Sequence, residues 1–169
     1  METDKIKVIF LDIDGVLNVY GTEHDQYGQI FHEHFVENLR TVVNKTGAKI
    51  VISSTWRFSG IERMRELWKF RNLPGEVIGI TIDCYDLIKE GRFEFYDDVT
   101  RGHEIQDWID DNVNRIQNYV IFDDDNDFLP GQRGNFVRTS NNINHSDCVD
   151  IGYGLTKICA EKAIRILNN

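Results

Sequence analysis

Asp12 and Asp14 are separated by one residue and directly follow an apolar run, in the stretch KIKVIFLDIDGVLN. The run is rich in β-branched residues and predicts a buried strand whose carboxyl end carries both side chains. A buried ionised carboxylate is costly unless it is paired or bound to a metal ion. The spacing therefore indicates either a catalytic or metal-binding pair, or a simple turn at Gly15, because Asp and Gly are common turn residues.

Polar residues also follow two later apolar runs. The run 48–52 ends in Ser53 and Ser54, and the run 119–122 ends in a cluster of aspartates: Asp123, Asp124, Asp125 and Asp127. A solvated acidic turn is the alternative interpretation of that cluster, and Asp125 and Asp127 fit either interpretation equally well.

Two arginines are candidates for binding an anion near these runs. Arg57 comes shortly after the two serines, and Arg101 begins a helix for which Thr100 is the expected N-cap. A cation is mildly disfavoured at a helix N-terminus, so Arg101 indicates an anionic neighbour or simple solvation.

The elements that position these residues alternate along the chain. Strands are expected over 5–11, 48–52, 77–82, 119–122 and, as a short edge strand, 136–138. Helices are expected from 33 to a C-cap at Gly47, after a capping box of Ser59 and Glu62, after Thr100, and over 155–167. The segment 18–30 is expected to be a loop or short hairpin, and 83–99 has no clear pattern.

Side-chain spacing also predicts which residues form the core. The third helix is expected to bury Ile105, Trp108, Ile109 and Val113, and the last helix Leu155, Ile158, Ala163 and Ile166 or Leu167. Trp56, Trp68 and Trp108 are expected to be core aromatics.

This alternation predicts an α/β fold, a three-layer, Rossmann-like, mainly parallel sheet with helices on both faces, forming a single domain over 1–169. The carboxyl ends of parallel strands lie at one edge, where ligands bind near the switch in strand order. The aspartates of the first run, the serines of the second and the aspartates at 123–124 are therefore expected to converge. No Gly-x-Gly-x-x-Gly follows the first strand, which argues against a dinucleotide-binding domain.

Converging carboxylates require a cation, because each pair at about 4 Å repels by roughly 4 kcal/mol at an effective dielectric near 20. Ligands that are all oxygen atoms suit Mg²⁺, which completes its coordination with water and substrate phosphate. A phosphorylated substrate is therefore expected, with serine hydroxyls, an arginine and a helix N-terminus binding its phosphate oxygens.

Charge and composition exclude several other classes of function. The net charge of −9 argues against broad, non-specific binding to nucleic acid or to anionic membranes. No apolar stretch approaches the length of a membrane span and the first residues do not resemble a signal peptide, so a cytoplasmic location without membrane partners is expected. The spacing of Cys84, Cys148 and Cys159 predicts reduced thiols.

The motifs DIDGV, ISS, an arginine that opens a helix, and DDD occur in the order typical of one family. The chain resembles the haloacid dehalogenase-like (HAD) superfamily of phosphohydrolases over nearly its whole length. More narrowly, LDIDGVLN, TGAKIVISSTWR and VIFDDD resemble the HAD domains associated with Swiss Army Knife RNA repair proteins.

The resemblance implies a role for each residue. Asp12 would accept the phosphoryl group as an aspartyl-phosphate, and Asp14 would protonate the leaving oxygen and later deprotonate water. Ser53, or alternatively Ser54, would bind the phosphoryl group. Arg101 occupies the position of a basic residue that is more often lysine, and Arg57 is its rival. The implied Mg²⁺ ligands are Asp12, the backbone carbonyl of Asp14, Asp123 and Asp124.

Three functions remain open at this point. The first is a Mg²⁺-dependent phosphomonoesterase, and the second is a phosphatase specific for nucleic-acid 3′ ends. The third is a phosphate-binding module without turnover. Neither interval between the motifs is long enough for a full cap domain, so a large phosphorylated substrate or a nucleic-acid end is expected.

Overall fold

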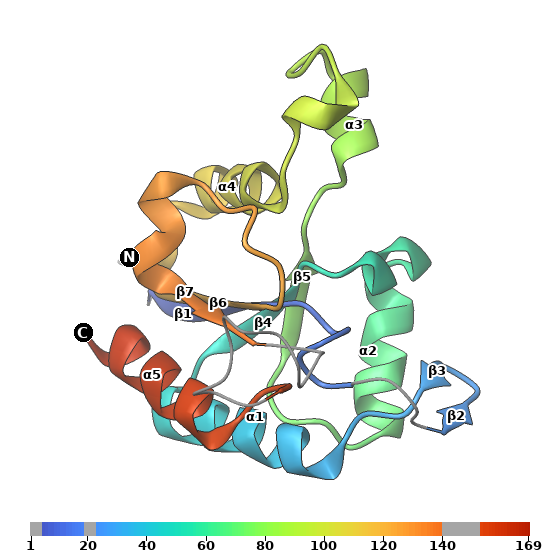
Figure 1. Cartoon of the computed structure of the whole chain (residues 1–169), viewed down its shortest axis with the longest axis vertical. Helices are drawn as coiled ribbons and strands as arrows, with labels where there is room; N and C mark the ends of the chain where they lie inside the picture. The colour runs from blue at the N-terminus through green and yellow to red at the C-terminus, as the bar shows by residue number, and fades with distance from the viewer. Residues whose placement is uncertain (1–4, 19–22, 140–152) are drawn as a thin grey trace.

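A computed structural model of the chain describes residues 5–18, 23–139 and 153–169. A wholly parallel five-stranded sheet lies at its centre in the order β5-β4-β1-β6-β7 (Figure 1). Its strands are β1 (Ile6–Leu11), β4 (Lys49–Ile52), β5 (Val77–Ile80), β6 (Ile116–Asp123) and β7 (Phe136–Arg138). The expected parallel sheet and its edge strand β7 are confirmed, and the chain order switches direction at β1.

Helices cover both faces of the sheet, as the α/β prediction required. One face carries α1 (Glu33–Thr46), α2 (Ile61–Phe70) and α5 (Lys157–Asn168), and the other carries α4 (Arg101–Asn112) (Figure 1). Short 3₁₀ helices also occur in the connections: η1 (Thr55–Ser59), η2 (Tyr96–Asp98) and η3 (Pro130–Asn135). Within 18–30, the described residues include a small hairpin of β2 (His24–Asp25) and β3 (Gly28–Gln29).

Alternating side chains of each strand fill two separate cores. Leu11 packs with Leu39 and Leu167 on the side of α1, α2 and α5, whereas Phe10 packs with Ile105 on the side of α4. Successive side chains of a strand point to opposite faces. The residue that follows Leu11 therefore faces α4.

Two helical faces differ from their prediction. Val113 is 61% exposed, because it is the C-cap of α4 and lies beyond the turns that pack on the sheet. Ile158 is 52% exposed, because Cys159 and Ala160 occupy the inward positions in the first turns of α5.

The predicted capping box of Ser59 and Glu62 is also wrong. Ser59 ends η1, and the N-cap of α2 is Gly60, which makes no side-chain cap and has a φ of 85°. The chain passes from one helix to the next through a left-handed backbone conformation that glycine adopts readily.

The segment 83–99 contains α3 (Cys84–Lys89) and η2, and it projects from the body of the molecule at the top of Figure 1. The rings of Tyr85 and Tyr96 pair at 4.9 Å between centroids, and both side chains are exposed. This insertion between β5 and α4 is short, in agreement with the expectation of a minimal cap.

Two predictions concern the environment of the chain. Within the described residues, none of the helices has the length and apolar character needed to cross a membrane. Cys84 and Cys159 are free thiols, as expected, and Cys148 lies outside the described residues.

Candidate active site

One polar residue from each of four strand ends contributes to a row across the carboxyl edge of the sheet. The order in the row is Thr81, Ser53, Asp12 and Asp123, and all four side chains are buried. Backbone hydrogen bonds from Ser53 N to Leu11 O, from Asp12 N to Phe122 O and from Thr81 N to Ile52 O, each 3.0 Å long, extend the parallel pairing past the strands. The preceding residues pack against α1, α2 and α5, so the row faces α4.

A cluster of three carboxyl groups lies at the centre of this edge. Oxygen atoms of Asp12, Asp123 and Asp124 all lie within 4.8 Å of one another. Burial raises the pKa of Asp12 to about 7, and the negative charge of Asp124 contributes in the same direction. Burial and the charge of Asp12 also hold the pKa of Asp123 well above its usual range. The cluster therefore carries more negative charge than its surroundings stabilise.

Positive charge and hydrogen bonds partly offset this repulsion. The guanidinium of Arg101, from the first turn of α4, acts most strongly to lower the pKa of Asp12, followed by hydrogen bonds from Ser54 and the backbone of Ile13. The arginine predicted at this helix start thus lies near the predicted nucleophile.

The donor set of the cluster fits a hard divalent cation such as Mg²⁺. All the candidate ligand atoms are carboxylate oxygens, and Oδ2 of Asp123 is buried without a hydrogen-bond partner in the described part of the chain. An orphaned buried acceptor needs a partner, and Mg²⁺ prefers oxygen ligands. Three of the four predicted metal ligands, Asp12, Asp123 and Asp124, contribute side chains to the cluster.

Gly15 is required where the turn meets this cluster. Its φ is +76°, and an added Cβ would lie 2.5 Å from Cγ of Asp124. No side chain fits at that distance, and the backbone conformation favours glycine as well. The turn and the candidate site are therefore one structure rather than alternatives.

Asp14 is not one of the three clustered carboxyl groups, but its charge helps to raise the pKa of Asp124. Two side chains hold it in place. Its Oδ1 accepts a hydrogen bond from Nδ2 of Asn18 (2.8 Å), and its Oδ2 accepts one from Nε1 of Trp56 (3.0 Å). The prediction that Trp56 is simply a core aromatic is therefore incomplete. Its ring packs against Phe31 but its polar edge faces Asp14.

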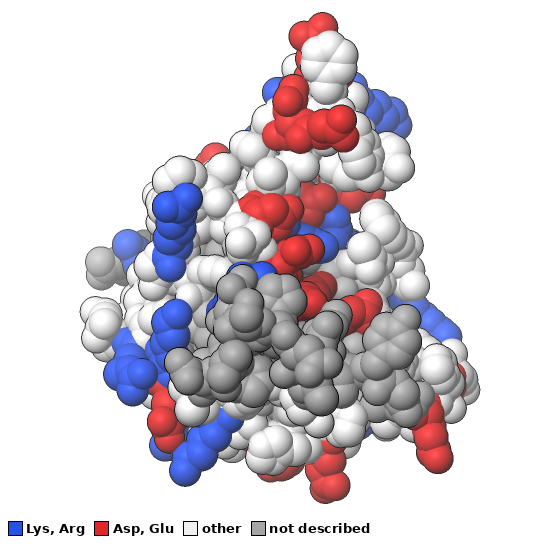
Figure 2. Space-filling model, in the orientation of Figure 1, with Lys and Arg blue, Asp and Glu red and all other residues white. Residues whose placement is uncertain are grey.

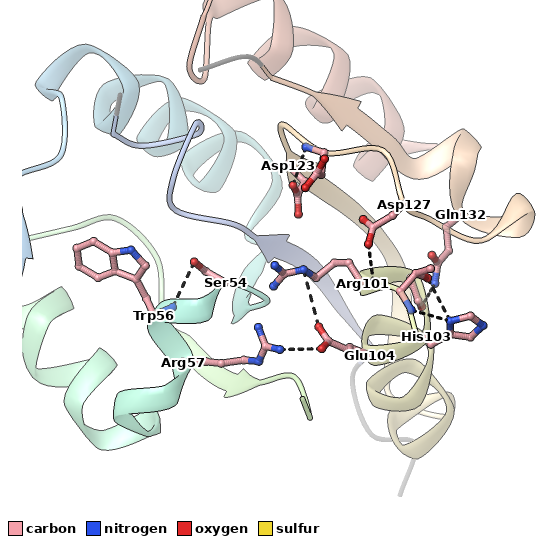
Figure 3. Close-up of polar contacts among 12 residues, drawn as sticks. Ser54, Trp56, Arg57, Arg101, His103, Glu104, Asp123, Asp127 and Gln132 are labelled. Carbon is pink, nitrogen blue, oxygen red and sulfur yellow. Dashed lines mark hydrogen bonds and ion pairs between the residues drawn. The ribbon is translucent and has the colours of Figure 1, made fainter. Parts of the chain in front are cut away.

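The two candidate arginines are joined by a buried glutamate (Figure 3). Nη2 of Arg57 lies 2.9 Å from Oε1 of Glu104, and Nε of Arg101 lies 3.8 Å from Oε2 of the same residue. Burial raises the pKa of Glu104 and lowers the pKa of Arg57, so desolvation outweighs their mutual attraction. Nε and Nη1 of Arg57 have no hydrogen-bond partner among the described residues.

The aspartates left open by the sequence have structural contacts. Oδ2 of Asp127 accepts a hydrogen bond from the backbone N–H of Arg101 (3.0 Å) at the start of α4, whereas the anionic neighbour of the Arg101 guanidinium is Glu104 (Figure 3). The backbone N–H of Asp125 donates to Oδ1 of Asp123 (2.9 Å). Both residues thus fix the loop that follows β6.

Sequence reasoning missed three residues near the site. Thr81 follows a predicted strand as Ser53 does, so the same reasoning could have found it; its buried hydroxyl has no partner among the described residues. Glu104 gives no signal, because its partner Arg57 is distant in the chain. Trp56 stands directly in the motif ISSTWR, but its type alone favours a core position.

Acidic side chains gather in the middle of one face and over the α3–η2 segment (Figure 2). A parallel sheet whose central strand ends in clustered aspartates, beside a serine pair and a helix that begins with arginine, is typical of haloacid dehalogenase-like domains. The family model described as the HAD domain in Swiss Army Knife RNA repair proteins matches residues 8–144, and the chain belongs to this family. Family membership indicates a phosphatase-type function. No significant match was found among curated proteins or among solved structures.

The raised pKa of Asp12 predicts how stability depends on pH. Between the ordinary value of 3.8 and about 7, the folded protein binds more protons than the unfolded chain. Asp12 should therefore contribute a fall of about 2–4 kcal/mol to the free energy of unfolding of chelator-treated protein as the pH rises through this interval. Urea unfolding at several pH values measures this slope, and Asp12→Asn should flatten it. An equal slope in both proteins contradicts the assignment.

Glu104 should be more important for stability than an exposed glutamate. Glu104→Gln leaves two guanidinium groups without their shared anion, and we expect a loss of about 3 kcal/mol. Glu62, whose exposed carboxylate pairs with Arg65 at 2.9 Å, provides the control. Its change to Gln should cost less than about 1 kcal/mol. Similar urea midpoints for the two variants would argue against a buried network.

Proposed function

We propose that the protein is a Mg²⁺-dependent phosphomonoester hydrolase that acts through an aspartyl-phosphate on Asp12. The main observation in support is the buried cluster of Asp12, Asp123 and Asp124 beside the guanidinium of Arg101. The proposed nucleophile, the proposed cation ligands and the proposed phosphate-binding arginine lie together at one sheet edge, and family membership indicates a phosphatase-type function.

The proposed reaction takes place in two steps. In the first, a carboxylate oxygen of Asp12 bonds to phosphorus while the bond to the leaving oxygen breaks, and Asp14 gives a proton to that oxygen. In the second, Asp14 takes a proton from water as the water oxygen bonds to phosphorus, and the bond between phosphorus and the Asp12 oxygen breaks, which releases phosphate and restores the Asp12 carboxylate. Splitting the displacement in this way divides one difficult step into two easier ones.

Arg101 and the serines would bind the phosphoryl oxygens. The hydroxyl of Ser54 already accepts the backbone N–H of Trp56 and acts to lower the pKa of Asp12, whereas that of Ser53 has no partner among the described residues. Ser53 is therefore the better donor to a phosphoryl oxygen. Arg57 would not bind the phosphoryl group in this scheme. It would hold Glu104, which in turn pairs with Arg101 and fixes its position.

Mg²⁺ would be held by Asp12, Asp123, Asp124 and the backbone carbonyl of Asp14. When bound, it supplies positive charge that keeps the carboxylates ionised and neutralises the incoming phosphoryl group. Its affinity should rise with pH, since these carboxyl groups bind protons more readily than usual.

The mechanism predicts a strict dependence on Asp12. Purified protein should release phosphate from para-nitrophenyl phosphate with Mg²⁺, and Asp12→Asn should reduce the rate by at least about a thousandfold. Chelation should have the same effect and added Mg²⁺ should restore the rate. Asp97→Asn, at an exposed position of η2, is the matched control and should retain full activity. Turnover by Asp12→Asn would exclude the aspartyl-phosphate.

A phosphatase specific for nucleic-acid 3′ ends is the second candidate. The matched family is described as the HAD domain in RNA repair proteins, which favours this candidate. The insertion at α3–η2 is too short to enclose a small metabolite, so the site suits the end of a long molecule better. The net charge of −9 weighs against this candidate, because contact with a nucleic-acid backbone depends on positive charge.

A substrate comparison separates these candidates. An end-specific enzyme should dephosphorylate a 3′-phosphorylated RNA oligonucleotide at least about tenfold faster, in kcat/KM, than the corresponding free 3′-nucleotide. Equal values would leave a general phosphomonoesterase. No turnover across a broad panel of phosphoesters would favour a phosphate-binding module instead.

A further inference from the structure

Both carboxylate oxygens of Asp14 accept a hydrogen bond from a nitrogen donor. Nδ2 of Asn18 reaches Oδ1 at 2.8 Å and Nε1 of Trp56 reaches Oδ2 at 3.0 Å. The side chain of Asp14 is itself exposed, so solvent alone would leave its orientation free. Two donors on different oxygens fix the plane of the carboxylate, because a rotation would break at least one of them.

The two donors are themselves held in place. Asn18 is buried, and its backbone carbonyl accepts a hydrogen bond from the N–H of Gly15 (3.0 Å). The indole of Trp56 lies 5.5 Å from the ring of Phe31, and a Cβ added at Gly28 of the hairpin would lie 3.3 Å from it. The hairpin and Phe31 therefore restrict the ring that contacts Asp14.

Trp56 also contacts the nucleophile's side of the site. Its backbone N–H donates to Oγ of Ser54 (3.4 Å), and the Ser54 side chain in turn lowers the pKa of Asp12. One residue of η1 thus contacts Ser54 through its backbone N–H (Figure 3) and Asp14 through its indole.

We propose that Trp56, together with Asn18, is a positioning residue that aims the Asp14 carboxyl at the leaving-group oxygen. This inference rests on the proposed function. As Asp12 bonds to phosphorus, the electron pair of the breaking P–O bond stays on the leaving oxygen, which receives the Asp14 proton. Asp14 becomes a carboxylate, and the two N–H donors stabilise the charge that develops on it.

If Trp56 positions the general acid, its loss should affect substrates differently according to how much their leaving group needs a proton. The para-nitrophenolate ion is a stable anion and leaves with little help from a proton. Phenolate is more basic and depends on proton transfer. Loss of the Trp56 N–H should therefore slow cleavage of phenyl phosphate more than cleavage of para-nitrophenyl phosphate, although the two substrates have similar shapes.

Trp56→Phe tests this, because it keeps an aromatic ring and removes the donor. We expect kcat/KM for phenyl phosphate to fall about tenfold and that for para-nitrophenyl phosphate to fall less than about threefold. Asn18→Leu should give the same pattern. Trp68→Phe is the matched control, because the indole of Trp68 donates to the carbonyl of Pro74 (3.0 Å), and it should leave the ratio of the two substrates unchanged.

An equal loss of kcat/KM for both substrates, or no loss, overturns the inference and leaves the proposed function intact. A wild-type protein without phosphatase activity contradicts the proposed function itself. The contact is tested independently by the indole N–H resonance of Trp56, assigned from its absence in Trp56→Phe. That resonance should shift in Asp14→Ala while that of Trp68 does not. An unmoved resonance overturns the positioning role whether or not the protein turns over a substrate.

Discussion

Burial of the Asp12 carboxyl group beside Asp123 and Asp124 is the constraint on which the rest of the site depends. Carboxylates at such separations repel by roughly 4 kcal/mol per pair near 4 Å at an effective dielectric of about 20. Arg101 and Ser54 offset part of this, yet the pKa values of Asp12 and Asp123 remain raised. The fold thus places together carboxyl groups that are difficult to ionise without a cation, and a divalent cation would balance their charge.

Helix α4 carries the compensating charge and is fixed from two directions. Asp127, from the loop after β6, accepts the backbone N–H of Arg101, and Glu104 joins Arg101 to Arg57 of η1. The helix start is therefore tied to the segments that follow β4 and β6. These segments carry the serines and the aspartates, so the same contacts fix the position of Arg101 relative to both groups.

Much of this could be predicted from the sequence, because strand ends are marked by an abrupt change from apolar to polar residues. That change correctly placed Asp12, Ser53 and Asp123 at strand ends. Because the carboxyl ends of parallel strands share one edge, it also predicted that the three residues lie close together. The turn predicted at Gly15 is present, and it needs a glycine for its φ and for the approach of Asp124. The catalytic and binding roles themselves remain predictions.

The rest depends on contacts that local pattern does not encode. Arg57 and Glu104 form an ion pair although they are distant in the sequence. The indole N–H of Trp56 donates to Asp14, and the type of residue alone does not predict this contact. Helix ends produced the errors at Val113 and Ile158, where periodicity continues in the sequence although packing does not. The segment 83–99 has no sustained period, because α3 and η2 are too short to show one.

Covalent trapping tests the central claim most directly. A single turnover of radiolabelled para-nitrophenyl phosphate with Mg²⁺, quenched in acid, should leave an acyl phosphate that hydroxylamine removes. Mass spectrometry should locate it on the peptide that contains Asp12, and Asp12→Asn should carry none. Phosphate release without a labelled peptide, or a label on another residue, would contradict the assignment of Asp12 as the phosphoryl acceptor.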